Sequence, residues 1–214
     1  MRDLLCNPST GHPIAFPDMP QIAREFAEIR PYGGATFIKA DPPWKLRDWS
    51  ENGDKRKTPD HHYKTQPLDW IKALPVSDLA APSCILFLWA THPMFPQALE
   101  VMIAWGFEYS TSGVWVKRTR RGKLAFGGGR RLRSASELFI IATRGKPPVR
   151  DRSIRTVIEG LRREHSRKPE EAYEIAEMMD PSHRRVDLFS RCERPGWRSW
   201  GDEKTKFNHE ESVS

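Results

Sequence analysis

The chain has few cysteines and no long apolar segment. Its three cysteines, Cys6, Cys84 and Cys192, are odd in number and far apart along 214 residues. This pattern argues against a disulfide framework and a cysteine metal cluster, so we expect no bound metal and a reducing, cytoplasmic location. No apolar run is long enough to cross a bilayer, and the N-terminus lacks the charged-then-apolar order of a secretion signal. We therefore expect no membrane partner.

The composition is that of a globular protein with a basic surface. Hydrophobic residues make up 38% of the chain and charged residues 29%, and 214 residues are enough for one domain with a substantial core. The net charge of +7 favours an anionic partner, with nucleic acid first, although many proteins are modestly basic for no specific reason. We expect a monomer or a homodimer, or a chain that works with a partner subunit.

Apolar runs alternate with segments of helical periodicity. Buried strands are predicted at Ala35–Ala40, Cys84–Trp89, Val114–Val116, Leu138–Ile141 and, as the final strand, Val186–Phe189. Helices are predicted near Ile22–Ile29, from Pro67 to Leu74 with a short stretch on to Ala81, from Phe95 through Leu99, Met102 and Ile103 to Gly106, and from Pro169 to Met179. This alternation predicts an α/β fold with a mostly parallel central sheet flanked by helices.

The chain divides into a main domain with two flanking parts. Residues 1–34 are rich in proline and predict an irregular cap, residues 35–203 form the main domain, and residues 204–214 form a polar tail. Residues 45–62 are polar and highly charged, which is typical of a long loop.

A tetrapeptide, Asp41-Pro42-Pro43-Trp44, follows the first predicted strand. Ligands of open α/β sheets bind outside the carboxyl ends of strands, and proline offers a carbonyl oxygen but no N–H. Asp41 and the Pro42 carbonyl are suited to accept two hydrogen bonds from an exocyclic amine, while Trp44 stacks on the ring that carries it. An Asp-Pro-Pro segment is also an ordinary way to end a strand in a turn, so the tetrapeptide alone leaves both interpretations open.

Residues 118–136 combine three consecutive glycines with many basic residues. Gly127-Gly128-Gly129 is not a phosphate loop, because no Lys-Ser/Thr follows it, and we interpret it as a hinge. Such a basic run is usually a solvated loop, but its place beside the predicted site favours contacts to phosphates. The basic residues assigned to the substrate are Lys117, Arg118, Arg130, Arg131 and Arg133.

Further motifs follow the tetrapeptide in a fixed order. They are Tyr63-Lys64-Thr65, Leu86–Thr91, Ala104–Phe107, Val114–Lys117, Arg163–Glu171, Asp187–Arg191, and Pro195–Trp197 with Gly201. Together with Asp41–Trp44, this ordered set resembles the MT-A70 family, which is named for the catalytic subunit of the mRNA adenosine N6-methyltransferase. The resemblance covers roughly residues 35–203. The chain departs from the family pattern at Glu193 and Arg194, where the human-type enzyme has His-Asn, and in its glycine-arginine insert.

The resemblance implies a Rossmann-like methyltransferase fold that uses S-adenosyl-L-methionine to methylate the N6 amine of adenine in nucleic acid, with DNA slightly favoured over RNA. The catalytic residues it implies are Asp41, Pro42, Pro43 and Trp44, and Tyr63 joins Trp44 on the substrate side. The cofactor-binding residues it implies are Asp41, His165, Lys168, Phe189, Ser190, Arg191, Asp202 and Glu203, with Lys168 on the cofactor's carboxylate. Two alternatives stay open: an inactive partner that only binds nucleic acid, and a methyltransferase that acts on a side-chain amide.

Overall fold

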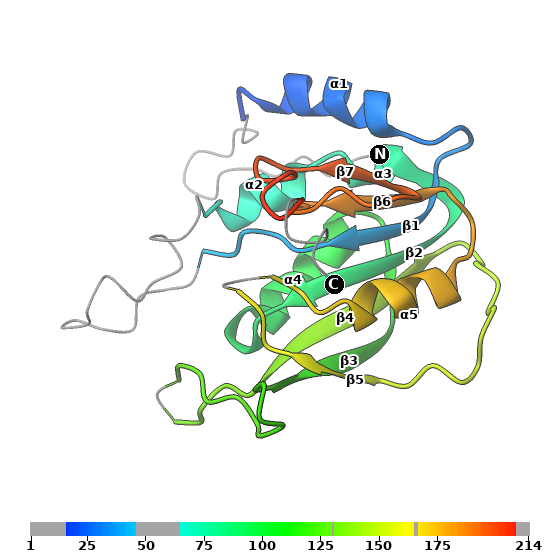
Figure 1. Ribbon diagram of the computed structural model, residues 1–214. Coiled ribbons are helices and arrows are strands. Elements are labelled where there is room, and N and C mark those ends of the chain that lie inside the picture. The colour runs from blue at the N-terminus through cyan, green and yellow to red at the C-terminus, as the bar shows by residue number, and fades with distance from the viewer. Residues whose placement is uncertain (1–15, 46–64, 130, 165–166, 209–214) are drawn as a thin grey trace.

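The fold is built around one mixed sheet. The computed structural model describes residues 16–45, 65–129, 131–164 and 167–208. Within these residues the sheet has seven strands in the order β5-β3-β4-β2-β1-β6-β7 (Figure 1). Their bounds are β1 Ala35–Ala40, β2 Ala80–Ala90, β3 Glu108–Arg118, β4 Ser136–Arg144, β5 Val157–Leu161, β6 Arg185–Leu188 and β7 Trp197–Trp200.

Only β4 runs against the other strands of this sheet. It pairs antiparallel with both β2 and β3, whereas the pairs β1–β2, β1–β6, β3–β5 and β6–β7 are parallel. The predicted mostly parallel sheet is therefore confirmed. The carboxyl ends of six strands and the amino end of β4 consequently meet at one edge, where ligands of open α/β sheets bind.

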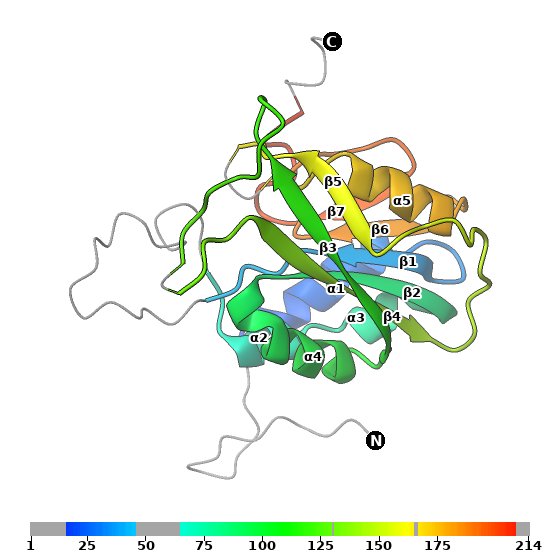
Figure 2. The same cartoon turned by 90° about the horizontal axis from the view of Figure 1, so that it is seen from below.

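Helices cover both faces of the sheet (Figure 2). Side chains of α1 (Met19–Ile29), α2 (Leu68–Ala73), α3 (Val76–Leu79) and α4 (Phe95–Ala104) pack on one face, and α5 (Glu171–Met179) packs on the other. Successive residues of the central strands alternate between the two cores: Ile38 joins the first core and Phe37 the second. A strand buried on both faces needs a continuous apolar run, which is why β1 and β2 were predictable.

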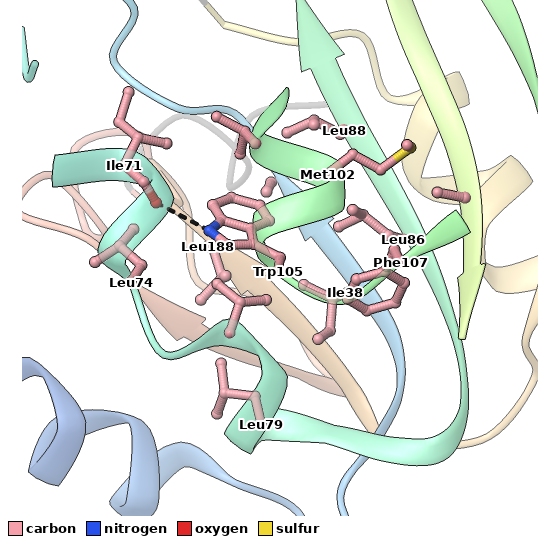
Figure 3. Packing of buried hydrophobic residues seen from close by; sticks show 14 of the residues in the cluster. Ile38, Ile71, Leu74, Leu79, Leu86, Leu88, Met102, Trp105, Phe107 and Leu188 are labelled. Atoms are coloured by element: carbon pink, nitrogen blue, oxygen red, sulfur yellow. Dashed lines mark hydrogen bonds between the residues drawn. The ribbon is translucent and has the colours of Figure 1, made fainter. Parts of the chain in front are cut away.

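Trp105 lies at the centre of the larger core (Figure 3). It is fully buried, and its indole Nε1 donates a hydrogen bond of 2.9 Å to the carbonyl oxygen of Ile71 in α2. The bond satisfies a polar group that would be costly to bury alone. Trp105 thereby fixes the end of α4 against α2. Gly106 follows with a φ of 81°, so it ends the helix as predicted.

Four details of the predicted elements are wrong. Val186–Phe189 is not the final strand, because β7 follows it, and β5 was not predicted at all. Both strands lie at sheet edges, where short, partly exposed strands lack a continuous apolar run. Ala80 and Ala81 begin β2 instead of ending a helix. Ile103, expected to face the core, is 67% exposed, and Ala98 and Val101 are buried in α4 instead.

A buried polar trio joins β1, β6 and α5. The Lys39 Nζ donates to Asp187 Oδ1 at 2.8 Å and to the Tyr173 hydroxyl at 3.1 Å, and that hydroxyl donates to Asp187 Oδ2 at 2.8 Å. Burial by itself would lower the pKa of Lys39, but the attraction of Asp187 and Tyr173 raises it above its ordinary value. Lys39 therefore stays charged inside the fold, and the stability of the fold depends on Asp187 to pair with this charge.

Asp187→Ala should destabilise the fold by about 3–5 kcal/mol, because it leaves the Lys39 ammonium buried without its carboxylate. Urea unfolding of the purified variant measures this change. Glu100→Ala is the matched control, since Glu100 pairs with Lys72 at 3.1 Å but is 53% exposed and should matter little. Equal stabilities of the two variants would contradict the structural role assigned to Asp187.

Candidate active site

A large cavity opens along the edge where the strands end. Its volume is about 1060 Å³, which is enough for a ligand of the size of a nucleotide cofactor together with a base. Every strand contributes to its wall at this edge. The lining includes Asp41–Trp44 after β1, Thr91 after β2, Trp115 and Lys117 in β3, Glu137 in β4, Arg162–Glu164 after β5, Phe189–Arg191 after β6, and Trp200–Glu203 in and after β7.

A chain of alternating charges crosses this cavity. The Lys168 Nζ lies 2.9 Å from Asp41 Oδ2 and 2.7 Å from Glu137 Oε1, and the second oxygen of Glu137 lies 2.9 Å from the Lys117 Nζ. Both lysines also lie over indole rings: Lys168 over Trp89 and Lys117 over Trp115. The four charges sum to zero, so the group can be buried at modest cost.

Burial and pairing together set the ionisation of this group. Burial would raise the pKa of Glu137, but the nearby Lys168 and Lys117 ammonium groups outweigh it and lower the pKa from 4.5 to about 2. For Lys168, burial acts to lower the pKa, but Asp41 and Glu137 raise it above its ordinary value. Glu137 is therefore a carboxylate and Lys168 an ammonium throughout the neutral range.

The tetrapeptide forms a compact turn at the end of β1. The Asp41 N–H donates to the Leu188 carbonyl of β6, and the Pro42 carbonyl accepts the Trp44 N–H at 2.8 Å. The Pro43 carbonyl accepts the Gln66 N–H at 3.0 Å. Both proline carbonyls thus accept hydrogen bonds from N–H groups of the chain itself. A carbonyl oxygen has a second lone pair, so the Pro42 carbonyl keeps acceptor capacity toward a ligand.

Trp44 is more deeply buried than a freely exposed stacking platform would be. It is 3% exposed, belongs to the larger core, and donates from its Nε1 to the Trp89 carbonyl at 3.2 Å. It nevertheless contributes to the cavity wall. The bond to Trp89 joins the end of β1 to the end of β2, so Trp44 has a structural role beside any contact with a base.

The turn after β6 provides backbone that closely approaches β7. Phe189 has a φ of 60°, which is unusual for a residue with a side chain, and its ring meets that of Trp200 edge to face at 5.3 Å. A Cβ on Gly201 would lie 3.0 Å from the Phe189 Cα, so this close approach requires glycine. Strained backbone of this kind clusters at ligand sites.

The polar residues of this region differ in how freely they can reach a ligand. The Ser190 hydroxyl donates to the Cys192 carbonyl at 2.8 Å, and Arg191 pairs with Glu203 at 3.3 Å. Asp202 is exposed and lines the cavity. The structure thus brings Phe189, Ser190, Arg191, Asp202 and Glu203 to one wall.

The predicted basic residues fall into two groups. Lys117 pairs with Glu137, and Arg118 pairs with Glu159 at 3.0 Å, so both are already engaged. Arg131 and Arg133 are exposed on the segment between β3 and β4. Three predicted site residues, Tyr63, Arg130 and His165, lie outside the described residues.

Sequence reasoning missed Glu137. Its only signal was an acidic residue at the start of a predicted apolar strand, and that strand was not expected to run antiparallel. A strand that runs against its neighbours carries its amino end to the ligand edge, which is why Glu137 reaches Lys168. Among residues 16–45, 65–129, 131–164 and 167–208, no group of three His, Cys, Asp or Glu side chains is placed to hold a metal, and no helix has the length and apolar character to cross a membrane.

Comparison with known proteins matches most of the chain. A family model described as MT-A70 matches residues 36–203. The chain is 32% identical over 181 residues to a Mycoplasma sp protein named Type II methyltransferase M.MunI, covering 77% of this chain and 75% of that one.

Eukaryotic relatives match over a smaller share of their own length. The chain is 29% identical over 195 residues to the Mus musculus protein N(6)-adenine-specific methyltransferase METTL4, covering 82% of this chain and 39% of that one. It is 27% identical to the Cryphonectria parasitica protein N6-methyladenosine RNA methyltransferase MTA1, covering 82% of this chain and 53% of that one. The chain therefore spans about half or less of these two relatives.

Glu137→Gln should make the stability of the fold less sensitive to a fall in pH. A carboxylate whose pKa is lowered by folding contributes stability above its unfolded pKa and loses it as the pH falls toward the folded pKa. For Glu137 that window runs from 4.5 down to about 2, and the shift corresponds to roughly 3 kcal/mol. Urea unfolding between pH 7 and pH 3 should show a shallower loss for the variant than for the unaltered protein.

The matched control for this prediction is Glu159→Gln. Glu159 pairs with Arg118, but its side chain is 61% exposed, so solvent screens the pair. Its variant should follow the unaltered protein across the same pH range. Parallel curves for all three proteins would show that Glu137 is not held as a carboxylate by its lysines.

Proposed function

Because the chain belongs to the MT-A70 family, we propose that it transfers a methyl group from S-adenosyl-L-methionine to the N6 amine of adenine in nucleic acid. The observation that carries the proposal is the Asp41 carboxylate, which lies in the wall of the cavity with one oxygen bound to Lys168. DNA is slightly favoured over RNA as the substrate. The names of the relatives, which include an N(6)-adenine-specific methyltransferase and an N6-methyladenosine RNA methyltransferase, support adenine as the target.

Asp41 and the Pro42 carbonyl carry the chemistry in this proposal. The amine of adenine is a poor nucleophile, because its lone pair is delocalised into the ring. Two acceptors that hold its N–H groups favour the geometry in which that lone pair is localised, so they stabilise the transition state more than the bound substrate. Lys168 holds the Asp41 Oδ2, which assigns Oδ1 to the amine. The same pairing fixes the orientation of the Asp41 carboxylate.

No strong base is needed before the attack. The nitrogen becomes strongly acidic once it carries the new methyl group, and Asp41 lies within reach to receive its proton. S-adenosyl-L-methionine, when bound, supplies a methyl group on a positively charged sulfur. The negative charge of Asp41 also suits a site beside that sulfur.

The residues of the cavity fit such a cofactor. Lys168 is assigned to the carboxylate of the cofactor. That carboxylate must then share the Lys168 ammonium with Asp41 and Glu137. Asp202 and Glu203 are assigned to hydroxyl groups of its ribose, and the close backbone of Phe189 and Gly201 leaves room for it beside Ser190 and Arg191. His165 is placed on the same side by family resemblance alone.

The substrate side of the proposal rests on Trp44 and on the basic segment. Trp44 would contact the adenine by the part of its ring that reaches the cavity. Arg131 and Arg133 are exposed beside the cavity mouth and would contact phosphates, whereas Lys117 and Arg118 would have to leave their present carboxylate partners to do so. Tyr63 and Arg130 complete the proposed substrate set.

Two rival functions predict different results in one experiment. An inactive partner would bind nucleic acid but transfer nothing, and an amide methyltransferase would label protein. Incubating the protein with cofactor carrying a labelled methyl group and with matched DNA, RNA and protein pools, followed by digestion, identifies the modified unit. Label in N6-methyladenine supports the proposal; label in a side-chain amide, or none, overturns it. The intact pairing of Asp41 with Lys168 favours activity over an inactive site.

Asp41→Asn should lower the rate of methyl transfer by about two to three orders of magnitude, because it replaces a charged acceptor with a neutral amide beside the amine. Single-turnover assays with saturating cofactor measure the rate. Calorimetry with the cofactor serves as the control, and it should show that the variant still binds. Near-unaltered turnover would remove Asp41 from the reaction.

Lys168→Met should raise the dissociation constant for the cofactor by about 10-fold to 100-fold, which corresponds to the loss of one charge-assisted hydrogen bond. Calorimetry measures the constant, and thermal unfolding checks that the fold survives the loss of an ion pair. Lys204→Met is the matched control, because Lys204 is 51% exposed and pairs only loosely with Glu193 at 3.9 Å. If both variants keep the unaltered affinity, Lys168 does not bind the cofactor.

A further inference from the structure

An exposed aromatic side chain stands at the mouth of the cavity. Phe126, on the segment between β3 and β4, is 73% exposed and lines the same cavity as Asp41–Trp44. Both ribbon views show this segment extending beyond the ends of its two strands (Figures 1 and 2). An exposed phenylalanine contributes little to the hydrophobic core, since most of its ring stays in water. Because this ring also lines the cavity, it is available to a ligand that enters there.

The backbone on both sides of Phe126 is held in place. The Ala125 N–H donates to the Lys117 carbonyl at 2.8 Å, and the Gly127 N–H donates to the Ser134 carbonyl at 2.8 Å. The Ser134 N–H donates to the Gly128 carbonyl at 2.9 Å. These bonds tie the backbone beside Phe126 to β3 and to the residues just before β4, and Gly127 and Gly129 allow two backbone segments to lie close together. Backbone hydrogen bonds on both sides of Phe126 therefore hold the residue that carries the ring.

The segment that carries Phe126 is rich in basic residues. Residues 118–136 contain no acidic residue, and they carry seven arginines and lysines. The Arg133 guanidinium carbon lies 5.2 Å from the centre of the Phe126 ring. A flat aromatic ring among arginines is the combination that binds unpaired nucleobases, because the ring stacks on a base while the cations hold the phosphates.

We infer that Phe126 is the stacking platform for a nucleobase that adjoins the target adenine. The inference rests on the proposed function, because it places the target base in the cavity with Asp41. A base next to the target must then leave its own stack to reach Phe126, so the preferred substrate presents at least two unpaired nucleotides at the mouth. Phe126 thereby selects polynucleotide over free adenosine. It is a specificity residue, since the reacting atoms lie deeper in the cavity.

A protein partner suits this face less well. The segment carries seven basic residues and few apolar ones, whereas the centres of protein interfaces are depleted in charge. Leu132 on the same segment is 86% exposed but does not line the cavity. The two residues therefore separate the hypotheses: a base beside the cavity contacts Phe126 alone, while a protein that covers the segment contacts both.

The test is equilibrium binding of a single-stranded oligonucleotide that has one adenine flanked by 2-aminopurine. Four proteins are compared over a salt series: the unaltered chain, Phe126→Ala, Phe126→Trp and Leu132→Ala. Phe126→Ala should weaken binding by about 5-fold to 100-fold, the effect of losing one stacked base, with an unchanged salt slope because no phosphate contact is lost. The quenching of 2-aminopurine fluorescence, which stacking on Phe126 causes, should disappear in the Phe126→Ala variant.

The controls fix the interpretation. Phe126→Trp should retain affinity and quenching, because indole also stacks, and Leu132→Ala should behave like the unaltered protein. Free adenosine, which has no neighbouring base, should be methylated with equal kcat/KM by the unaltered chain and by Phe126→Ala. Thermal unfolding should be the same for all four proteins, since neither position is buried.

Each contrary outcome has its own meaning. Equal affinities of Phe126→Ala and Leu132→Ala for the oligonucleotide, with methylation intact, overturn the stacking role and leave the proposed function standing. If both variants instead abolish a dimer seen by sedimentation, without affecting oligonucleotide affinity, the segment is an interface between copies. If the unaltered chain neither binds nor methylates the oligonucleotide, the proposed function and this inference both fail.

Discussion

The double ion pair of Lys168 is the interaction on which the rest of the site depends. Its ammonium is buried, and it binds Asp41 after β1 and Glu137 at the start of β4. A buried ammonium is stable only when carboxylates replace its water, so Lys168 draws three separate parts of the chain to one point. Asp41 is thereby oriented and Glu137 is held as a carboxylate. Lys117 completes the neutral group and lines the cavity.

The antiparallel direction of β4 makes this arrangement possible. In an all-parallel sheet, Glu137 would begin its strand at the opposite edge, far from Lys168. The reversed strand instead brings its first residues to the ligand edge, and Ala125–Gly128 and Ser134 of the segment before it line the same cavity. One topological feature thus supplies both the acidic partner of Lys168 and the exposed ring of Phe126.

The structure also assigns two roles to residues for which the sequence suggested one. Trp44 was expected to stack on a base, yet its indole also bonds to Trp89 and fills the core, so it couples the catalytic turn to β2. Lys168 was expected to hold the cofactor's carboxylate, yet it already holds two carboxylates of the protein. In both residues, the stability of the fold and the shape of the site depend on the same contact.

The sequence by itself determined the central strands, most helices and the position of the tetrapeptide, because continuous apolar runs, helical periodicity and Asp41-Pro42-Pro43-Trp44 are local patterns. It did not reveal β5 or β7, since short edge strands are only half buried and carry a weaker pattern. Only the tertiary structure decided that Glu137 pairs with Lys168, that Trp44 is buried, and that Phe126 stands at the cavity mouth. Burial and ion pairing arise between residues far apart along the chain, so no local pattern encodes them.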